Sequence, residues 1–584
     1  MLNGWRHEEF GVLAIDADTP WATAASANRS WRFQLNAWTF LGPALATYHR
    51  SGDFAVLAWA AAGAASWARH FTEFVDDHDA WYDMAVGLRG HRLGYLIDAL
   101  TASRGVDDAA LEVLLASADE HFAAYATEAL FADHSNHGLY FAAGQAALSR
   151  RLSSRPSASG HAEQAQGRLE TVLSTQFADD GSHLEHSPAY HLMVLESTSG
   201  IMAAGLVESE AVRRRVEAAA EALAWFVTPE RALVQFGDTA RRDLVASDPG
   251  RWTGQAMRHV ISRGEFGEAP TETSRTFPIG GYWVAKDRWW DAAPNARAPS
   301  YLALTAAFHS RVHKHADDLS ISWWDWGHEI LVDAGRYGYV GALDAKDPAR
   351  LEGFFYSAPE RQFVESTRAH NTVQVDDRDF PRRDATPYGS GIVLAQTVGA
   401  AQGVVAEVTH FGTITHTRVV VTVSGEWMLV YDKVRDLAND NHSFSQRFAF
   451  APELAVDIVG EGLRARLRGG SVEVRVVSLD GAQPIVPVRG ADNPLLGWVS
   501  RADRVLMPST SSGFRHDDLA FTTFATLFTA GASDVAGRLE RYAGPCGGDA
   551  VTIATAAARW RLFLGPFGTG DTPLTIVEEH LAHA

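Results

Sequence analysis

The chain has 584 residues and a formal net charge of -20, with 46% hydrophobic and 21% charged residues. A single hydrophobic core stops growing at roughly 250 to 300 residues, so we expect two or three domains. The acidic balance argues against a nucleic-acid partner, for which a basic face is the first expectation. No apolar run approaches the ~20 residues that a membrane helix requires, so we expect no membrane partner either.

The N-terminal stretch MLNGWRHEEFGVL lacks a basic region followed by an apolar core. This pattern predicts a cytoplasmic protein, unless a signal peptide has been removed. The only cysteine, Cys546, excludes an internal disulfide framework and a cysteine-based zinc site. Any bound metal is therefore expected to take histidine and carboxylate ligands.

Ala-rich segments between Trp31 and about Arg263 repeat apolar residues every three to four positions, which is typical of amphipathic helices. Turn-rich breaks such as SSRPSASG separate these segments. The pattern predicts antiparallel helical hairpins arranged about a common axis, as in a toroid, over residues 1–270. The clearest helical segments are 54–74, 111–131 and 211–227.

Beyond residue 270 the pattern changes to short β-branched and aromatic runs with a period of two, such as LSISWWDW, NTVQVDD and SVEVRVVSL. The run RVVVTVSGEWMLVYDKV predicts a hairpin that turns at Ser424 and Gly425. We expect a stacked antiparallel β-sandwich over residues 271–450 and a further β-rich region over residues 451–584.

A cluster of histidines and aspartates stands out in FHSRVHKHADDLSISWWDWG. On a strand, His313 and His315 would project from the same face and could serve one site. A lone histidine is more often a polar side chain on an edge strand. Three histidines of the same parity beside Asp317 and Asp318 favour a functional site.

Two further residues extend this cluster. Asp333 ends an apolar run in EILVDAGRYGY, and His370 precedes another in STRAHNTVQVDD. A His, Asp, His set gathered from separate strands suits zinc. The alternative for Asp333 is a turn residue close to a glycine.

The helical half contains its own polar clusters. Asn136 and His137 stand where a helix could begin, and a simple helix cap is the alternative for Asn136. Pro188 confines the next helix to the residues after it and places Tyr190 in the first turn, where a side chain can face a cleft. An ordinary amphipathic tyrosine is the alternative for Tyr190.

The segment EHSPAYH does not match the zinc-protease pattern, because its histidines stand five apart with a proline between them. Paired carboxylates at Asp179, Asp180 and Glu185 would instead suit a glycoside hydrolase, with a polar loop as the alternative interpretation.

Taken together, the chain resembles the heparinase II/III-like polysaccharide lyases, a superfamily that includes alginate lyases. The resemblance covers most of the chain and rests on motifs in matching order: RSWRFQLNAWTFLG, WYDMAVGLRGHRLGYL, the Asn-His pair, DDGSHLEHSPAYH, HKHADDLSISWWDWG, VDAGRYGY and RAHNTVQVDD. It implies an N-terminal (α/α) toroid and an antiparallel β-sandwich region, with the substrate groove between them.

The resemblance also implies roles for single residues. Asn136 and His137 match residues that engage a substrate carboxylate, Tyr190 the catalytic tyrosine and His313 the catalytic histidine. The matching metal set, which we expect to hold a structural zinc, is His315, Asp333 and His370. The expected substrate-binding residues are Trp81 and Arg89, which would line the groove, Tyr140, which replaces an acidic residue of some members, and Tyr356.

The implied reaction is a β-elimination that cleaves a uronic-acid-containing polysaccharide or oligosaccharide and leaves an unsaturated uronate end. The lack of an export signal mildly favours attack on imported oligosaccharides from one end. Either His313 or Tyr190 could be the base, depending on the stereochemistry of the uronate. A glycoside hydrolase and a noncatalytic glycan-binding protein are the alternatives.

Overall fold

The structure is a computed structural model, and it describes residues 5–7, 11–16, 19–21, 29–76, 78–103, 107–245, 247–252, 254–293, 297–344, 346–351, 353–383, 385–470, 472–531, 534–542, 548–565 and 572–580. Cys546 lies outside these residues. By its internal contacts the chain divides into two units, described separately below. The helical unit is Met1–Phe177 with Val194–Val216, and the β unit is Ala178–Met193 with Glu217–Ala584.

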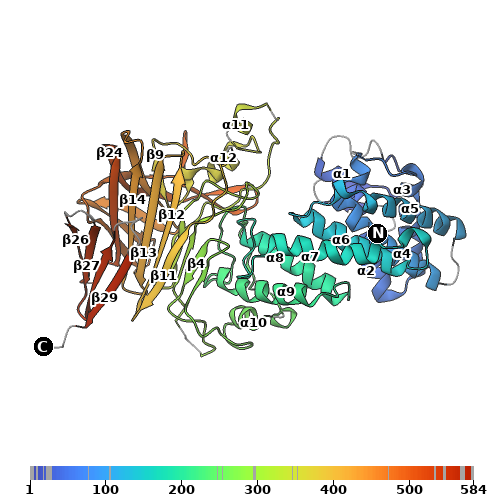
Figure 1. Ribbon diagram of the computed structural model, residues 1–584, viewed down its shortest axis with the longest axis horizontal. Coiled ribbons are helices and arrows are strands. Elements are labelled where there is room, and N and C mark those ends of the chain that lie inside the picture. Colours follow the sequence, from blue (N-terminus) through green and yellow to red (C-terminus); the bar gives the residue numbers. More distant parts are fainter. Residues whose placement is uncertain are drawn as a thin grey trace. The chain divides into compact units, whose positions relative to one another are not determined.

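The helical unit is built from consecutive helices joined by short connections, as the apolar periodicity predicts (Figure 1). The predicted break at SSRPSASG contains only the short 3₁₀ helix η3 (Pro156–Ala158). The α-helices of this unit are α1 (Arg29–Asn36), α2 (Leu41–Ser51), α3 (Phe54–His70), α4 (Asp83–Ala102), α5 (Asp108–Ala126), α6 (Asn136–Arg151) and α7 (His161–Gln176). Two further helices, α8 (Pro188–Ala203) and α9 (Glu210–Leu223), are shared with the β unit. The short elements are η1 (Asp79–Trp81), η2 (Glu128–Leu130), β1 (Trp5–His7) and β2 (Gly11–Leu13).

Helix α4 packs closely on α6 because glycines remove side chains from the contact. A Cβ on Gly87 would lie 2.2 Å from the Tyr140 carbonyl oxygen, and one on Gly144 would lie 2.0 Å from the Gly87 carbonyl oxygen. Any larger residue at either position would force the two backbones apart. These glycines therefore set the position of α6, which begins at the predicted Asn136–His137 pair.

The β unit consists mainly of antiparallel sheets. Sheet I contains β3 (Ser274–Phe277), β4 (Tyr282–Ala285), β5 (Tyr301–Thr305), β7 (Ile321–Asp325), β8 (His328–Leu331), β9 (Val373–Val375), β15 (His442–Phe450), β19 (Gln483–Arg489) and β24 (Thr510–Leu519). Sheet II contains, in spatial order, β11 (Ile392–Val398), β12 (Ala401–His410), β13 (Ile414–Val423), β14 (Trp427–Asp436), β25 (Phe521–Ala530), β18 (Glu473–Ser478), β17 (Gly462–Leu467) and β16 (Leu454–Val459).

Smaller elements complete this unit. Sheet III contains β26 (Ala536–Tyr542), β27 (Gly548–Ala554), β28 (Ala558–Leu564) and β29 (Leu574–His580). Two-stranded pairs are β6 (Ala307–Phe308) with β10 (Gly389–Ser390), β20 (Ala491–Asp492) with β21 (Leu495–Leu496), and β22 (Trp498–Ala502) with β23 (Val505–Pro508). The helices are η4 (Ala224–Phe226), η5 (Pro249–Arg251), α10 (Gln255–Ser262), α11 (Pro348–Leu351), α12 (Pro359–Glu365) and η6 (Thr367–Ala369).

The central strands of sheet II lie between sheets I and III and are buried on both faces, which explains their nearly continuous apolar runs (Figure 1). Val420 joins the core shared with sheet I, whereas its neighbour Val419 joins the core shared with sheet III. Strands covered on both faces need apolar residues at consecutive positions. The predicted hairpin is confirmed, because β13 pairs with β14 from Val423 opposite Trp427 onward.

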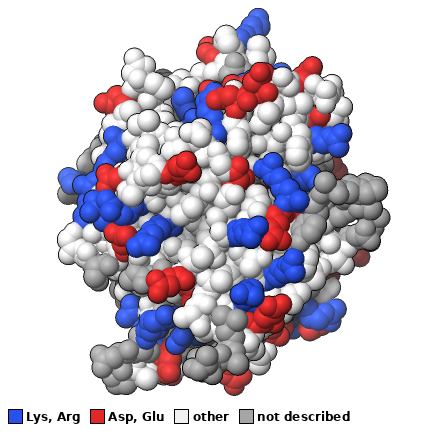
Figure 2. Space-filling model, turned by 90° about the vertical axis from the view of Figure 1, so that its left-hand side faces the viewer, with Lys and Arg blue, Asp and Glu red and all other residues white. Residues whose placement is uncertain are grey.

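Sheets I and II both take strands from either side of residue 450, so a division of the chain there would cut through both sheets. The fold class is confirmed: a helical N-terminal region with the (α/α) toroid fold is followed by an antiparallel β-sandwich region. Among the described residues, no helix is both long and apolar enough to cross a lipid bilayer. Basic and acidic side chains are interspersed on the face of the β unit that Figure 2 draws.

One ion pair is fully buried in the core of this unit. Arg418 and Asp432 face each other across β13 and β14 and form two hydrogen bonds of 2.7 Å. Arg418 also donates to the carbonyl oxygens of Leu319 and Asn371, so it ties sheet II to the segment that follows His315. Burial alone would raise the pKa of Asp432, but the Arg418 guanidinium holds it well below its usual value.

We expect Asp432→Asn to lower the free energy of unfolding by about 3 to 5 kcal/mol, because it leaves the Arg418 charge buried without its partner. The depressed pKa means that the pair stabilises the fold above the unfolded-state pKa of about 3.9, and that this contribution is lost as the pH falls toward the folded-state pKa. Chemical denaturation at neutral and acid pH measures both effects. Asp457→Asn, which removes a surface pair with Arg466, is the control and should cost less than about 1 kcal/mol.

Candidate active site

Three backbone segments of the β unit meet at Gly237. A Cβ there would lie 2.5 Å from the His313 carbonyl oxygen and 2.7 Å from that of His186, so only glycine fits. The Asp238 backbone N–H donates to the same His313 carbonyl at 3.1 Å. His186 and His313 both have left-handed backbones, with φ of 62° and 57°. Such conformations are strained for residues with a Cβ and tend to occur at functional sites.

Asp238 is the centre of the polar network that these segments create. Its Oδ2 lies 3.0 Å from His313 Nδ1, its Oδ1 lies 3.0 Å from His315 Nε2, and Arg361 pairs with Oδ1. Burial alone would raise the pKa of Asp238, but the Arg361 charge and the hydrogen bonds from the two histidines hold it well below its usual value. Asp238 is thus a carboxylate, and both histidine nitrogens that face it must donate.

Tyr190 lies against His313. The two rings are stacked with centroids 3.5 Å apart, and the Tyr190 hydroxyl is 3.0 Å from the Tyr339 hydroxyl. Tyr339 donates its own proton to Asp238 Oδ2 at 2.9 Å, so the remaining donor between the tyrosines is Tyr190. Burial raises the pKa of Tyr190 to about 12, which keeps its hydroxyl protonated at neutral pH.

His313 is left with one nitrogen that can accept a proton. Because Nδ1 donates to Asp238, the neutral ring carries its lone pair on Nε2. Glu185 Oε2 lies 3.5 Å from this Nε2 and would attract the imidazolium formed when it takes up a proton. The arrangement of carboxylate, histidine and a nearby tyrosine hydroxyl is suited to moving protons between carbon and oxygen.

A cavity of about 350 Å³ opens beside these groups. His313, Tyr339 and Tyr356 line it together with Arg311 and Arg361. Tyr356 stacks on Tyr339 with ring centroids 4.9 Å apart. The predicted residue Tyr356 therefore lies next to Tyr339, the residue that bonds to Tyr190. Arg311 lines the cavity and is exposed, so it can meet an anionic ligand.

The predicted strand through His313 and His315 is wrong. Residues 309–320 form turns and irregular backbone, and the regular strand β7 begins only at Ile321. The left-handed φ of His313 is incompatible with an extended strand. The two histidines still serve one site, because both reach the same carboxylate rather than because they share a strand face.

The predicted metal ligands are all buried near one another. His370 Nδ1 lies 3.1 Å from Asp333 Oδ2, and the rings of His315 and His370 are 5.5 Å apart. His315 Nδ1 and His370 Nε2 are buried and have no hydrogen-bond partner among the described residues, and a bound metal would satisfy such nitrogens. However, no set of three or more such side chains within the described ranges has metal-site geometry. The three residues are thus close neighbours that are not drawn together into a metal-binding group in this structure, and the zinc site stays a prediction.

The predicted residues of the helical unit fall into two groups. Asn136 is the first residue of α6 and is not its cap, because Ser135 Oγ accepts from the His137 backbone N–H. His137 Nδ1 lies 3.2 Å from Asp83 Oδ2, and its side chain is one-third exposed. Tyr140 is half-buried, and its hydroxyl is 2.8 Å from Ser197 Oγ.

The prediction that Trp81 and Arg89 line a groove is wrong. Both are buried, and the Arg89 guanidinium lies over the Trp67 and Trp81 rings and donates to the backbone carbonyls of Asn36 and Ala80. Burial lowers the pKa of Arg89 to about 9. Helical periodicity could not distinguish a groove face from a core face that contains a hydrogen-bonded arginine.

Sequence reasoning missed Asp238, Tyr339 and Arg361. Tyr339 lies in VDAGRYGY, which contains the predicted metal ligand Asp333. Arg361 lies in APERQF, close to the predicted substrate-binding residue Tyr356. Asp238 ends the apolar run ALVQFGD, and a carboxylate placed after a glycine at the end of a buried run was the available signal. Nothing in the local pattern indicates the partners that Asp238 meets.

We expect His315 and His313 to differ when each is changed to alanine. His315 is fully buried and bonded to Asp238, so its loss should lower the free energy of unfolding by about 2 to 4 kcal/mol, with activity falling as well. His313 is partly exposed, so His313→Ala should spare the fold while it removes activity. Thermal melts and turnover of both variants measure this; equal losses of stability would contradict the division.

Family models of the heparinase II/III class match nearly the whole chain. The heparinase II/III N-terminus model matches residues 4–252, and the heparinase II/III-like C-terminal model matches residues 269–536. The chain belongs to the heparinase II/III-like family of polysaccharide lyases. No curated protein matches it in sequence.

Solved structures show the same fold at low sequence identity. The heparan sulfate lyase HepC of Pedobacter heparinus is 18% identical with a TM-score of 0.70, covering 99% of this chain and 87% of that chain. A mutant of that lyase is 17% identical with a TM-score of 0.72, covering 97% and 88%. A heparinase III is 14% identical with a TM-score of 0.72, covering 99% and 88%.

Proposed function

We propose that this protein cleaves uronic-acid-containing glycans by β-elimination, with His313 as the base and Tyr190 as the acid. The observation that carries the proposal is the Tyr190–His313 stack, in which His313 bonds to the Asp238 carboxylate directly and Tyr190 reaches it through the Tyr339 hydroxyl. Membership of a polysaccharide lyase family supports the reaction type. The heparan sulfate and heparinase III lyases of the same fold support a glycosaminoglycan as substrate.

The reaction needs two proton transfers on one sugar pair. The C5–H bond next to the uronate carboxylate breaks and its proton goes to His313 Nε2. The electron pair forms the C4–C5 double bond, the C4–O4 bond breaks, and O4 takes the Tyr190 hydroxyl proton. No water is consumed. The products are an unsaturated uronate end and a free hydroxyl on the leaving sugar.

Tyr339 can restore the starting state. After one turnover His313 carries an extra proton and Tyr190 lacks one. The Tyr339 hydroxyl lies 3.2 Å from His313 Nδ1 and 3.0 Å from the Tyr190 hydroxyl, so it can pass a proton from the histidine to the tyrosine. This leaves the remaining His313 proton on Nε2; water removes that proton and returns one to Nδ1, so the starting tautomer is restored and no proton is gained or lost overall. The site is thereby ready for a second substrate.

The transition state gathers charge on the uronate carboxylate, so fixed cationic or polar donors are required. In the β unit Arg311 lines the cavity and is exposed, which suits it to this role. A separate proposal concerns the helical unit, where Asn136 and His137 are expected to engage a substrate carboxylate. Loss of turnover in Asn136→Ala with unchanged melting would support it.

A hydrolase with paired carboxylates is less well supported. Asp180 accepts hydrogen bonds from the backbone N–H groups of Ser182, Ile279 and Gly280, so it fixes loops instead of facing a ligand. Glu185 lies beside His313, where it can serve the elimination. A noncatalytic glycan-binding protein would need neither the lone pair on His313 nor a proton donor beside it.

We also retain zinc as a proposed structural cofactor of His315, Asp333 and His370. Support comes from one buried imidazole nitrogen on each of His315 and His370, for which the described part of the chain offers no hydrogen-bond partner. Metal analysis of the purified protein tests it, together with melting before and after treatment with a chelator. No step of the elimination described above depends on the metal.

The substrate is tested by incubating the protein with heparosan, heparan sulfate, hyaluronan, chondroitin and alginate oligosaccharides. An ultraviolet-absorbing unsaturated end should appear on at least one of them. End-on attack, which we also propose, should release one small product from the first minutes, whereas internal attack should release a ladder of sizes. Absence of unsaturated products from every uronate would reject the proposed reaction.

A further inference from the structure

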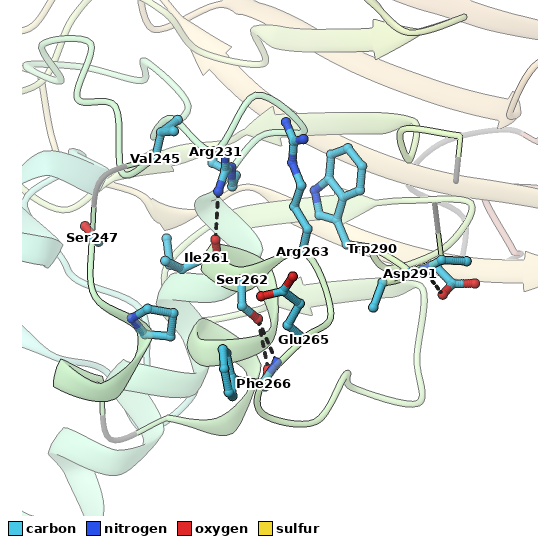
Figure 3. Close-up of a pocket in the computed structure, with 13 residues that line it drawn as sticks. Arg231, Val245, Ser247, Ile261, Ser262, Arg263, Glu265, Phe266, Trp290 and Asp291 are labelled. Atoms are coloured by element: carbon cyan, nitrogen blue, oxygen red, sulfur yellow. Dashed lines mark hydrogen bonds between the residues drawn. The ribbon is translucent and has the colours of Figure 1, made fainter. Parts of the chain in front are cut away.

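A second cavity, of about 630 Å³, lies in the β unit and shares no lining residue with the cavity at His313. Figure 3 shows its walls: the end of α10 with the turn after it, the turn at Arg231, and the segment at Trp290. Ser262 Oγ accepts from the Phe266 backbone N–H at 2.9 Å, and His259 Nε2 lies 2.9 Å from the Trp290 carbonyl oxygen. These bonds hold two of the walls in place.

Both arginines of this cavity occupy strained backbone positions. Arg231 has φ of 60° and Arg263 has φ of 56°. Arg263 is the C-cap of α10, a place where glycine or asparagine adopts the left-handed conformation at less cost. The chain therefore places long cationic side chains where the backbone alone would favour a small residue. Strain of this kind is a reason to look for a function of the side chains.

The two positive charges lie close together, and neither forms an ion pair with a carboxylate of the described residues. Burial lowers the pKa of Arg231, and the nearby Arg263 charge lowers it further. Arg231 donates through Nη1 to the Ile261 carbonyl at 2.9 Å, but its Nε is buried without a hydrogen-bond partner in the described part of the chain. Asp291 lines the cavity, yet its Oδ1 accepts from the Ala293 backbone N–H of its own loop.

An aromatic surface adjoins these charges. The Arg263 guanidinium lies over the Trp290 ring, 4.8 Å from its centroid (Figure 3). A stacked arginine and tryptophan form a flat platform of the kind on which a sugar ring can lie. Arginine also binds carboxylate and sulfate groups through paired N–H donors. The cavity thus combines anion donors with a surface for a sugar ring.

We propose that this cavity is a second, noncatalytic binding site for an anionic sugar chain. Arg231 and Arg263 hold a carboxylate or sulfate group, and the Arg263–Trp290 stack supports the sugar ring. The inference rests on the proposed function only for the choice of ligand, because no bond is made or broken here. Glu265, whose carboxylate also lines the cavity, weakens binding by repulsion.

The test uses the full chain carrying Tyr190→Phe, so that ligands are not consumed. Calorimetry with heparosan and heparin oligosaccharides should show two bound molecules per chain, and one after Arg231→Ala with Arg263→Ala. We expect affinity for the long polymers to fall about tenfold in this double variant. A loss of affinity for heparosan indicates that the site recognises carboxylates, and a loss of affinity for heparin alone indicates that it recognises sulfates. Unchanged stoichiometry and affinity on both glycans would overturn the proposal.

Two controls make the result specific. Arg475→Ala with Arg538→Ala removes the same charge from exposed positions outside the cavity, and an equal loss of affinity there would overturn the proposal as a general charge effect. Glu265→Gln leaves the arginines intact and should tighten binding, so weaker binding would count against an anionic ligand.

Turnover of short oligosaccharides by the Arg231/Arg263 variant with native Tyr190 should be unchanged. Failure of cleavage in the native protein would reject the catalytic proposal while the calorimetry still decides this one.

Discussion

Tyr190→Phe is expected to lower kcat by about a thousandfold or more while leaving substrate affinity within a few fold. The substitution removes only the hydroxyl, so the ring can still stack on His313 and hold the cavity wall. The leaving oxygen would then depart as an alkoxide without a proton donor. Steady-state turnover on the preferred uronate measures kcat, and binding to the same variant measures affinity.

The matched control is Tyr431→Phe. This change removes a buried tyrosine hydroxyl that donates to Asp549 at 2.6 Å in the same unit, away from the cavity. It should lower stability by about 1 kcal/mol and leave kcat unchanged. Retention of more than a tenth of the native kcat by Tyr190→Phe would remove Tyr190 from the mechanism.

Asp238→Asn is expected to reduce both activity and stability. An amide in place of the carboxylate keeps the shape but cannot accept from His313, His315 and Arg361 at once. It can also donate to His313 Nδ1, which would move the ring proton to Nε2 and leave no lone pair to take the C5 proton. We expect kcat to fall by about a thousandfold, and the loss of the Arg361 partner to cost about 2 to 4 kcal/mol.

Asp503→Asn is the control for this substitution. Asp503 pairs with Arg336 at 2.9 Å and is more than half exposed, so its change should cost less than about 1 kcal/mol and spare turnover. Turnover, denaturation and a pH profile of kcat should be measured on both variants. A near-native kcat for Asp238→Asn would show that the carboxylate does not set the protonation of His313.

Sequence patterns predicted the parts of the fold that depend on neighbouring residues. The β13–β14 hairpin follows from alternating apolar strands around Ser424 and Gly425, and the position of Tyr190 follows from Pro188 at the start of α8. Local preference and local sterics determine both features. The same patterns gave the order of helical and β regions.

Long-range contacts in the site could not be predicted in this way. Asp238 is 75 residues from His313 and 123 residues from Arg361 in sequence, and each partner lies on a different segment. The left-handed backbone at His313 also shows that its segment is not a strand, although the alternation of residues in the sequence predicted one. Arg89 shows a related limit, since a charged residue on a helix is usually exposed, whereas this one lies inside the core and donates to backbone carbonyls there.

The central claim is that the chain cleaves glycans by elimination rather than hydrolysis. Mass spectrometry of the products formed in ¹⁸O-labelled water tests it most directly, using the substrate on which activity is found. The account predicts an unsaturated uronate product that is one water lighter than the hydrolytic product, with no label in either fragment. A saturated product that carries one labelled oxygen would contradict it.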